Sequence, residues 1–184
     1  MRYFILLLMS VCTLHSNAQL DFPKWLMPDT LGQYVAIHGF MSSAKDSMPT
    51  EGEISIIKHG GKDMIYRFSC DIDGRFDVFL PANGHYSVKF EKKGHIMKVI
   101  DVFTSNVPKR AWKNTFALDL NAYMEVMPQG FDVSVSRVPF NIAKYDEEMK
   151  FFVFDEEFEK LRRISLDNEI KRCNDILAVS KPKI

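Results

Sequence analysis

The sequence predicts a mainly β protein, an antiparallel seven-stranded β-sandwich followed by a C-terminal α-helical appendage. Three observations support this prediction. Short segments within residues 33–120 alternate apolar and polar residues, as strands with one buried face do. Turn-forming residues such as the Asp73-Gly74 dipeptide separate these segments. After Asp155 the apolar residues recur every three or four positions, which is typical of an amphipathic helix.

The N-terminus has the order of a cleavable export signal. Arg2 supplies a positive charge, residues 4–11 form a short apolar block, and small residues at 16–18 precede the expected cleavage site. A membrane-spanning helix needs about 20 apolar residues, and this block is shorter. We therefore expect residues 1–18 to be a signal peptide. The mature protein is then exported to the periplasm or the cell surface and is not membrane-spanning.

The composition is that of an ordinary globular protein, with 46% apolar and 26% charged residues. A chain of 184 residues accommodates one domain and an appendage. The 24 basic and 24 acidic residues balance, so no basic surface of the kind that nucleic acid selects is indicated. We expect no nucleic-acid partner.

Residues 19–32 are expected to form an extended lead-in to the β-sandwich at residues 33–120. The first strand covers residues 33–40, because Val and Ile alternate there with smaller or polar residues. A polar, proline-containing loop at residues 41–52 follows, and then a second strand at residues 53–58.

The later strands show the clearest alternation. They are predicted at residues 64–70, 76–80, 86–90, 96–103 and 115–120. Polar residues occupy the opposite face, as in an antiparallel sheet with one wet side. The Asp-Gly pair at 73–74 and the Asn-Gly pair at 83–84 predict hairpins, because these residues adopt the positive φ angles that tight hairpins need. The expected core residues include Phe76, Val78, Tyr86 and Val88.

Residues 121–184 are expected to form a C-terminal extension with a helix from about residue 155 to 178. Its apolar stripe includes Leu166, Ile170 and Leu177. Two interpretations remain open: the stripe packs on the sandwich, or it is a docking surface for a partner. Globular proteins usually bury such a stripe, which favours the first interpretation.

Two cysteines, Cys70 and Cys173, lie beyond the predicted signal peptide. In an oxidising compartment they form a disulfide if the helix docks beside the strand that carries Cys70. The alternative is that both are buried and act as small apolar side chains.

A D-x-x-G-x-F segment followed by L-P-x-G-x-Y-x-V and a lysine-glycine step occupies residues 71–94. The residues that carry this pattern are Asp71, Gly74, Phe76, Leu80, Pro81, Gly84, Tyr86, Val88, Lys93 and Gly94. The pattern resembles the carboxypeptidase-regulatory-like, or transthyretin-like, domain, and the likeness extends over about residues 33–120. The resemblance implies a prealbumin-like (Ig-like) sandwich that serves as a non-catalytic module, as in small secreted envelope proteins of Bacteroidetes-type bacteria.

No group of residues in the sequence indicates a catalytic centre. None of His38, His59, His85 and His95 has the glutamate three residues later that a zinc peptidase of the H-x-x-E type needs. These histidines lie on different predicted strands and turns, so convergence of their imidazoles is left open. Each is interpreted as a surface or turn residue. The sequence therefore predicts no catalytic residue, no metal site and no cofactor.

These observations together predict an exported, non-enzymatic envelope protein, a structural or protein-binding module whose partner is another envelope protein. The candidate partner-binding residues are Leu166, Ile170, Leu177, Trp25 and Trp112. The alternative is a carbohydrate-binding module in which Trp25 or Trp112 stacks on a sugar. The competing interpretation of both tryptophans is burial at the edge of the core.

Overall fold

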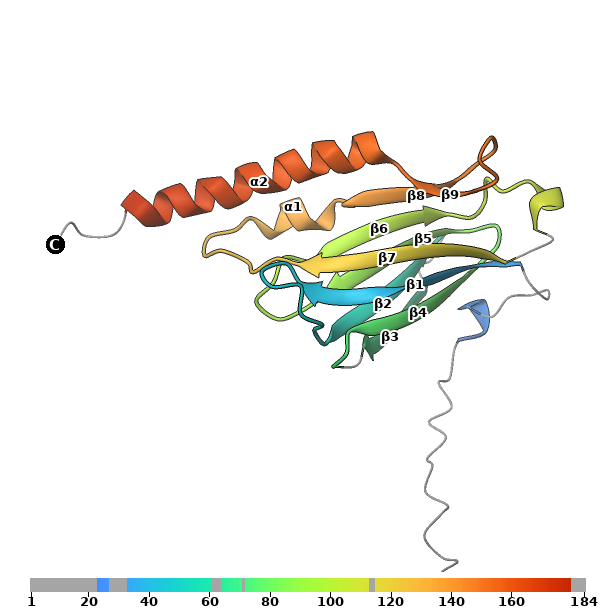
Figure 1. The fold of residues 1–184 in the computed structure, drawn as a ribbon, viewed down its shortest axis with the longest axis horizontal. Helices are drawn as coiled ribbons and strands as arrows, with labels where there is room; N and C mark the ends of the chain where they lie inside the picture. Colours follow the sequence, from blue (N-terminus) through green and yellow to red (C-terminus); the bar gives the residue numbers. More distant parts are fainter. Residues whose placement is uncertain (1–22, 27–32, 61–63, 71, 113–114, 180–184) are drawn as a thin grey trace, which may run out of the picture.

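The computed structural model describes residues 23–26, 33–60, 64–70, 72–112 and 115–179. Within these ranges the protein is mainly β, with nine strands in two sheets and a long C-terminal helix (Figure 1). The predicted signal peptide and most of the predicted lead-in lie outside the described residues.

The two sheets differ in size. The smaller has the order β4-β1-β7, with β4 Arg75–Pro81, β1 Tyr34–Ser43 and β7 Phe116–Met124. The larger has the order β3-β2-β5-β6-β8-β9, with β3 Met64–Cys70, β2 Gly52–His59, β5 His85–Glu91, β6 Lys98–Phe103, β8 Asn141–Asp146 and β9 Phe151–Phe154. The helical elements are η1 Lys24–Leu26, η2 Lys109–Ala111, α1 Val133–Arg137 and α2 Glu156–Val179.

The prediction of seven antiparallel strands is wrong in strand number and in direction. Both sheets are mixed, because β1 and β7 run parallel with Val35 opposite Phe116, and β6 and β8 run parallel with Ile100 opposite Asn141. Parallel neighbours need long connections, so a local sequence pattern does not show which strands they join. The two further strands, β8 and β9, come from the segment after residue 120 and extend the larger sheet.

The turns that predicted hairpins instead carry the chain from one sheet to the other. Gly74 has a φ of 68° and Asn83 a φ of 60°, so one residue of each predicted pair has a positive φ angle. However, β3 and β5 belong to the larger sheet while β4, between them in sequence, belongs to the smaller one. The buried Thr104 fixes the second crossing, because its Oγ1 donates to Pro81 O at 2.8 Å and accepts from Gly84 N at 2.8 Å.

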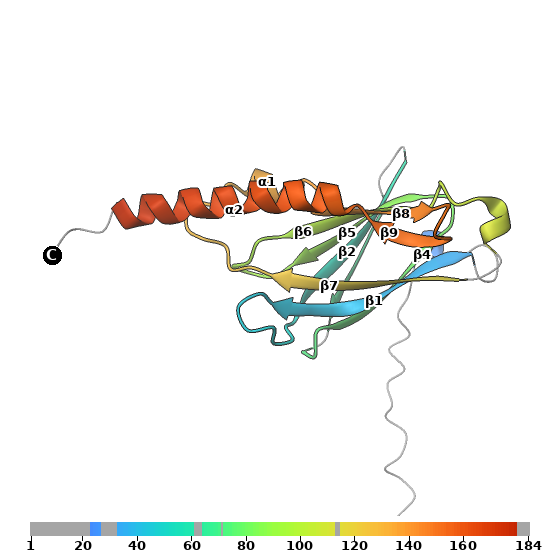
Figure 2. The ribbon, with the colours of Figure 1, turned by 45° about the horizontal axis from the view of Figure 1, so that its top comes forward.

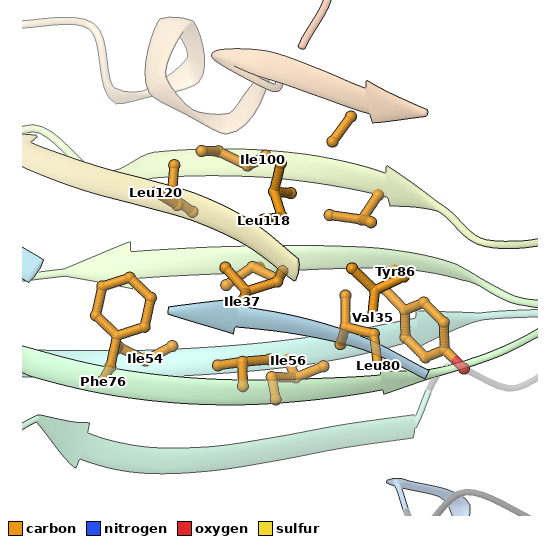
Figure 3. Close-up of a cluster of buried hydrophobic side chains, with 14 of the residues drawn as sticks. Val35, Ile37, Ile54, Ile56, Phe76, Leu80, Tyr86, Ile100, Leu118 and Leu120 are labelled. Carbon is orange, nitrogen blue, oxygen red and sulfur yellow. The ribbon is translucent and has the colours of Figure 1, made fainter. Parts of the chain in front are cut away.

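The core lies between the two sheets and is built from one face of each strand (Figures 2 and 3). It includes the predicted core residues Phe76, Val78, Tyr86 and Val88, all buried. Figure 3 shows Val35 and Ile37 of β1 among side chains of the other sheet, including Ile54, Ile56 and Tyr86. The predicted alternation is therefore confirmed for these strands, since residues two apart point to the same face.

Helix α2 begins after Asp155, close to the predicted start of the helix. The Asp155 Oδ1 accepts from the backbone N–H of Phe158 at 3.0 Å and satisfies a donor of the first turn. Lys144 of β8 lies 3.3 Å from Asp155 Oδ2. Both contacts favour the carboxylate, and the backbone hydrogen bond from Phe158 is the larger cause of the lowered pKa of Asp155.

The apolar stripe of α2 packs within the protein over residues 166–173. Leu166 and Cys173 are buried in a second apolar cluster with Ile96 and Phe131, and Ile170 packs against it. Figures 1 and 2 show α1 and α2 side by side, with α2 continuing beyond α1 toward the C-terminus. Leu166 and Ile170 therefore pack within the protein and do not form an exposed docking surface.

Polar contacts attach α2 to the segment before α1. Glu169 Oε1 accepts from the backbone N–H of Asp132 at 2.9 Å, and Arg172 donates to Gly130 O at 2.9 Å. Arg172 also donates to Glu169 at 2.7 Å and 2.5 Å. These hydrogen bonds from Arg172, followed by that from Asp132 N, lower the pKa of Glu169 to about 2.

We expect the Glu169 contact to survive mild acid. The pKa of Glu169 is lower in the folded than in the unfolded protein, where it is about 4.3. The ionised carboxylate therefore contributes its full stabilisation above pH 4.3, and this contribution is lost as the pH falls through the folded-state pKa. The amide resonance of Asp132, followed by NMR, should therefore show no Glu169 titration between pH 6 and pH 3. The Glu169→Gln variant separates this effect from titration of Asp132 itself. A wild-type step near pH 4.3 that the variant lacks would contradict the prediction.

No helix in the described part of the chain is both long enough and apolar enough to cross a membrane.

Candidate metal-binding site

Three strands of the larger sheet bring polar side chains together on its face opposite the core. Tyr86 and Val88 of β5 point into the core, so His85 and Ser87 point to the other face. The register places His59 of β2 opposite His85, and Asp101 of β6 opposite Ser87. Strand pairing therefore gathers two imidazoles, a hydroxyl and a carboxylate that are distant in sequence.

The four side chains form a hydrogen-bonded network. Ser87 Oγ donates to Asp101 Oδ1 at 2.5 Å. Since the hydroxyl has one hydrogen, Ser87 Oγ accepts from His59 Nε2 at 2.8 Å. The His59 and His85 rings lie with their centroids 4.5 Å apart, and the Phe103 ring stacks on His85 at 4.1 Å. The imidazoles are thus held in place by ring packing as well as by Ser87.

One atom of this network lacks a hydrogen bond within the described residues. His85 Nε2 is buried and has no hydrogen-bond partner there, although Asp101 Oδ2 lies 3.3 Å away. A buried nitrogen without a hydrogen bond is unfavourable, so such atoms call for a specific explanation. A metal ion bound between the imidazole of His85 and the carboxylate of Asp101 is an explanation that fits the chemistry of both groups.

His59, His85 and Asp101 are arranged so that they could hold a metal ion. One ligand atom from each lies within 4.8 Å of the others. Ligands bound tetrahedrally at 2.0–2.2 Å from a metal are about 3.4 Å apart, so binding requires the side chains to approach by a small rotation. Two imidazoles and one carboxylate suit zinc or ferrous iron better than magnesium or calcium, which prefer oxygen ligands.

A groove of about 680 Å³ lies on the same face of the sheet and reaches the network at His59 and Ser87. Its other lining residues are Ile57, Lys89, Glu91, His95, Met97, Val99, Met127, Val133, Ser136 and Arg137. They come from β2, β5, β6, α1 and the segments that flank β6 and follow β7. The candidate site is therefore next to a space large enough for a small organic molecule.

A second polar cluster lies beneath α2, around Lys98 of β6, which is only 5% exposed. Burial lowers the pKa of Lys98, and the nearby Glu125, 3.6 Å away, opposes this effect. Arg163 donates to the same Glu125 at 2.6 Å, and the Phe140 ring lies 4.8 Å from each cation. Lys98 and Arg163 thus share the carboxylate of Glu125, and because Arg163 belongs to α2, these contacts attach the helix to the larger sheet.

The residues predicted for partner or glycan binding do not converge on one surface. Trp112 is 5% exposed and packs edge-on against Phe116, and Trp25 is partly buried against the main core. Leu177 is half-buried near the end of α2. Trp112 is therefore not available as a sugar platform, in agreement with the competing interpretation of burial at the core edge.

The two cysteines lie in different apolar clusters. Cys70 is part of the main core, with its Sγ 3.7 Å from Met41 Sδ, and Cys173 is in the cluster under α2. Among the described residues, Cys70 and Cys173 are not joined by a disulfide. The two cysteines are not paired because α2 does not dock beside β3, the strand that carries Cys70.

Sequence reasoning missed the convergence of His59, His85 and Asp101. The expectation of no metal site was based on the absence of local ligand motifs. The three residues are separated by 26 and 16 positions in the sequence, and the pairing of β2, β5 and β6 brings them together. A signal was nevertheless present, because His59, His85 and Asp101 each lie at the outward parity of a predicted or flanking strand.

Comparison with known proteins gives matches at the level of structure alone. Neither a family model nor a curated protein sequence matches the chain. The resemblance to carboxypeptidase-regulatory-like domains therefore stays a prediction.

Solved structures that match include proteins named as dioxygenases. One is the 3-chlorocatechol 1,2-dioxygenase of Rhodococcus opacus 1CP, with a TM-score of 0.41, 9% identity, and coverage of 55% of this chain and 63% of that one. Another is the catechol 1,2-dioxygenase of Acinetobacter sp. ADP1, with a TM-score of 0.39, 10% identity, and coverage of 55% of each chain. A third is the dioxygenase domain of a dioxygenase–carbohydrate-binding protein fusion from Streptomyces sp. SirexAA-E, with a TM-score of 0.38, 14% identity, and coverage of 56% and 86%.

These matches contradict the expectation of a non-enzymatic, protein-binding or carbohydrate-binding module, because the matched proteins are enzymes. That expectation is not carried further. The chain spans less than two thirds of the first matched protein, and all three TM-scores are below 0.5. The matches therefore assign no activity to this chain, and its function has to be argued from the candidate site itself.

Proposed function

We propose that this protein binds a divalent transition-metal ion through His59, His85 and Asp101. The observation that carries the proposal is the approach of three ligand atoms to within 4.8 Å of one another on a preformed sheet face. The buried His85 Nε2, which has no hydrogen bond among the described residues, supports it. Zinc and ferrous iron are the metals that this set of two nitrogens and one oxygen favours.

Such a site has the composition of a catalytic metal centre. Three protein ligands leave at least one coordination position for water or a substrate, whereas structural zinc sites use four protein ligands. Ser87 donates a hydrogen bond to Asp101 and the Phe103 ring stacks on His85, so these two residues orient the ligands. The open groove at His59 provides access for a small molecule. Metal-assisted chemistry on an organic substrate is therefore the activity that this geometry supports best.

The proposal is tested by calorimetric titration of the metal-free protein with Zn²⁺, with Co²⁺ as a spectroscopic substitute. We expect one ion per chain. His85→Ala and Asp101→Asn should each weaken binding by about 100-fold or more, because two ligands hold the ion poorly. Ser87→Ala should weaken it by about tenfold, since Ser87 positions Asp101 without contacting the metal.

His38→Ala is the matched control. His38 lies on β1 of the smaller sheet and pairs with Asp77 at 2.5 Å, so it is also a histidine beside a carboxylate. Its removal should leave the metal affinity unchanged. Circular dichroism should show that every variant is folded. Equal zinc affinity in wild type, His85→Ala and Asp101→Asn would mean that the cluster is only a hydrogen-bonded polar network.

A further inference from the structure

The groove beside the candidate metal site is amphipathic. Its apolar lining consists of Ile57, Met97, Val99, Met127 and Val133. Val133 is 49% and Met127 37% exposed, so apolar surface is open to solvent at the rim. An apolar ligand that covers these side chains removes this surface from water, which favours binding.

The charges of the groove favour an anion. Lys89, Glu91 and Arg137 line it, and Lys89 pairs with Glu91 at 2.8 Å. Among the ion pairs within the described residues, none involves Arg137. Because Lys89 and Glu91 neutralise each other, the guanidinium of Arg137 leaves the groove with a net positive charge. Its planar arrangement of donors matches a carboxylate, to which it can donate two parallel hydrogen bonds.

The position of the groove connects it to the metal site. His59 and Ser87 belong both to the groove lining and to the hydrogen-bonded network that contains Asp101. A molecule that fills the groove therefore lies against the network. The volume of about 680 Å³ is in the range of small-molecule sites.

We propose that this groove binds an amphipathic organic acid, with its carboxylate on Arg137 and its apolar part beside the His59–His85–Asp101 site. The inference rests on the proposed metal-binding function and names the class of substrate that the site would take. Three properties of the groove support this class: the apolar lining, the single excess cation, and the shared residues His59 and Ser87.

Decanoate is the probe for this inference. Its binding to the zinc-loaded protein is measured by calorimetry and by saturation-transfer NMR. We expect decanoate to bind more tightly than decanol by about tenfold, because the alcohol lacks the charge that Arg137 recognises. Arg137→Gln should reduce the affinity for decanoate to that for decanol. Val133→Asp should weaken decanoate binding further, since it places a negative charge at the apolar rim.

Arg110→Gln is the control for loss of an arginine, because Arg110 is exposed on η2 and does not line this groove. It should bind decanoate as the wild type does. If decanoate does not bind the zinc-loaded protein, or binds Arg137→Gln and Val133→Asp as it binds the wild type, the inference is overturned while the metal-binding proposal stands.

The link to the metal site has its own readout. With Co²⁺ bound, the paramagnetic ion should broaden the NMR signals of bound decanoate. Binding without broadening would show that the occupied groove does not present the acid to the metal, and it would overturn the inference. If the metal titration itself fails, the proposed function fails. Decanoate binding to the metal-free protein that depends on Arg137 would then support the carboxylate specificity of the groove alone.

Discussion

Gly39→Ala is expected to prevent stable folding. Gly39 lies on β1, between β4 and β7. A Cβ atom added to Gly39 would lie 1.7 Å from the backbone oxygen of Leu120 and 2.9 Å from the Phe76 ring. The first contact is with backbone, so the clash is relieved only by separating β1 from β7. We expect a loss of about 4 kcal/mol or more, which is a large part of the stability of a domain of this size.

Urea denaturation followed by circular dichroism measures this effect. Gly94→Ala is the matched control, because Gly94 has a φ of 75° and a Cβ atom added to it would have no neighbouring atom within 4 Å. That variant should lose only about 1–2 kcal/mol, the cost of a left-handed conformation for alanine. A Gly39→Ala protein as stable as Gly94→Ala would mean that β1 and β7 are not packed as closely as described.

Val78→Asp is the second change with a large expected effect. Val78 lies on β4, opposite Ile37 of β1, and is 1% exposed. An aspartate there buries a carboxylate among apolar side chains of both sheets. The carboxylate either stays charged without a partner or becomes protonated, and both are costly, by about 4 kcal/mol or more.

The test is thermal unfolding of Val78→Asp beside Val179→Asp. Val179 is 87% exposed at the end of α2, so the same substitution there meets water and should leave the melting temperature unchanged. Val78→Asp should be insoluble or lack a cooperative transition. A cooperative transition within a few degrees of the wild type would overturn the assignment of Val78 to the core face.

The relation between pattern and fold is clearest along β4 and β5. The alternation of Phe76 and Val78, and of Tyr86 and Val88, identified both strands and the face that each buries. The same local signals suggested that the two strands form a hairpin, yet they lie in different sheets. A positive φ at Gly74 or Asn83 turns the chain, but the partner of each strand depends on which sheet edge offers hydrogen bonds.

The candidate site follows the same logic. The sequence pattern predicts that each of the three side chains points away from the core, at or next to a strand. It does not predict which other side chains lie beside it. His59 and His85 lie side by side because β2 pairs with β5, whereas β4 belongs to the other sheet. Asp101 joins them because β6 pairs on the other side of β5. The assembly of the candidate site thus depends on strand order.

Local sequence patterns were enough to predict the mainly β class, the buried faces of the central strands, and the helix that begins near Asp155. Periodicity and capping are local properties, and a short segment is enough to show them. The local patterns did not predict the two mixed sheets, the close approach of β1 and β7 at Gly39, or the convergence of His59, His85 and Asp101. These features depend on contacts between segments distant in sequence, whose pairing is selected by the packing of the whole core.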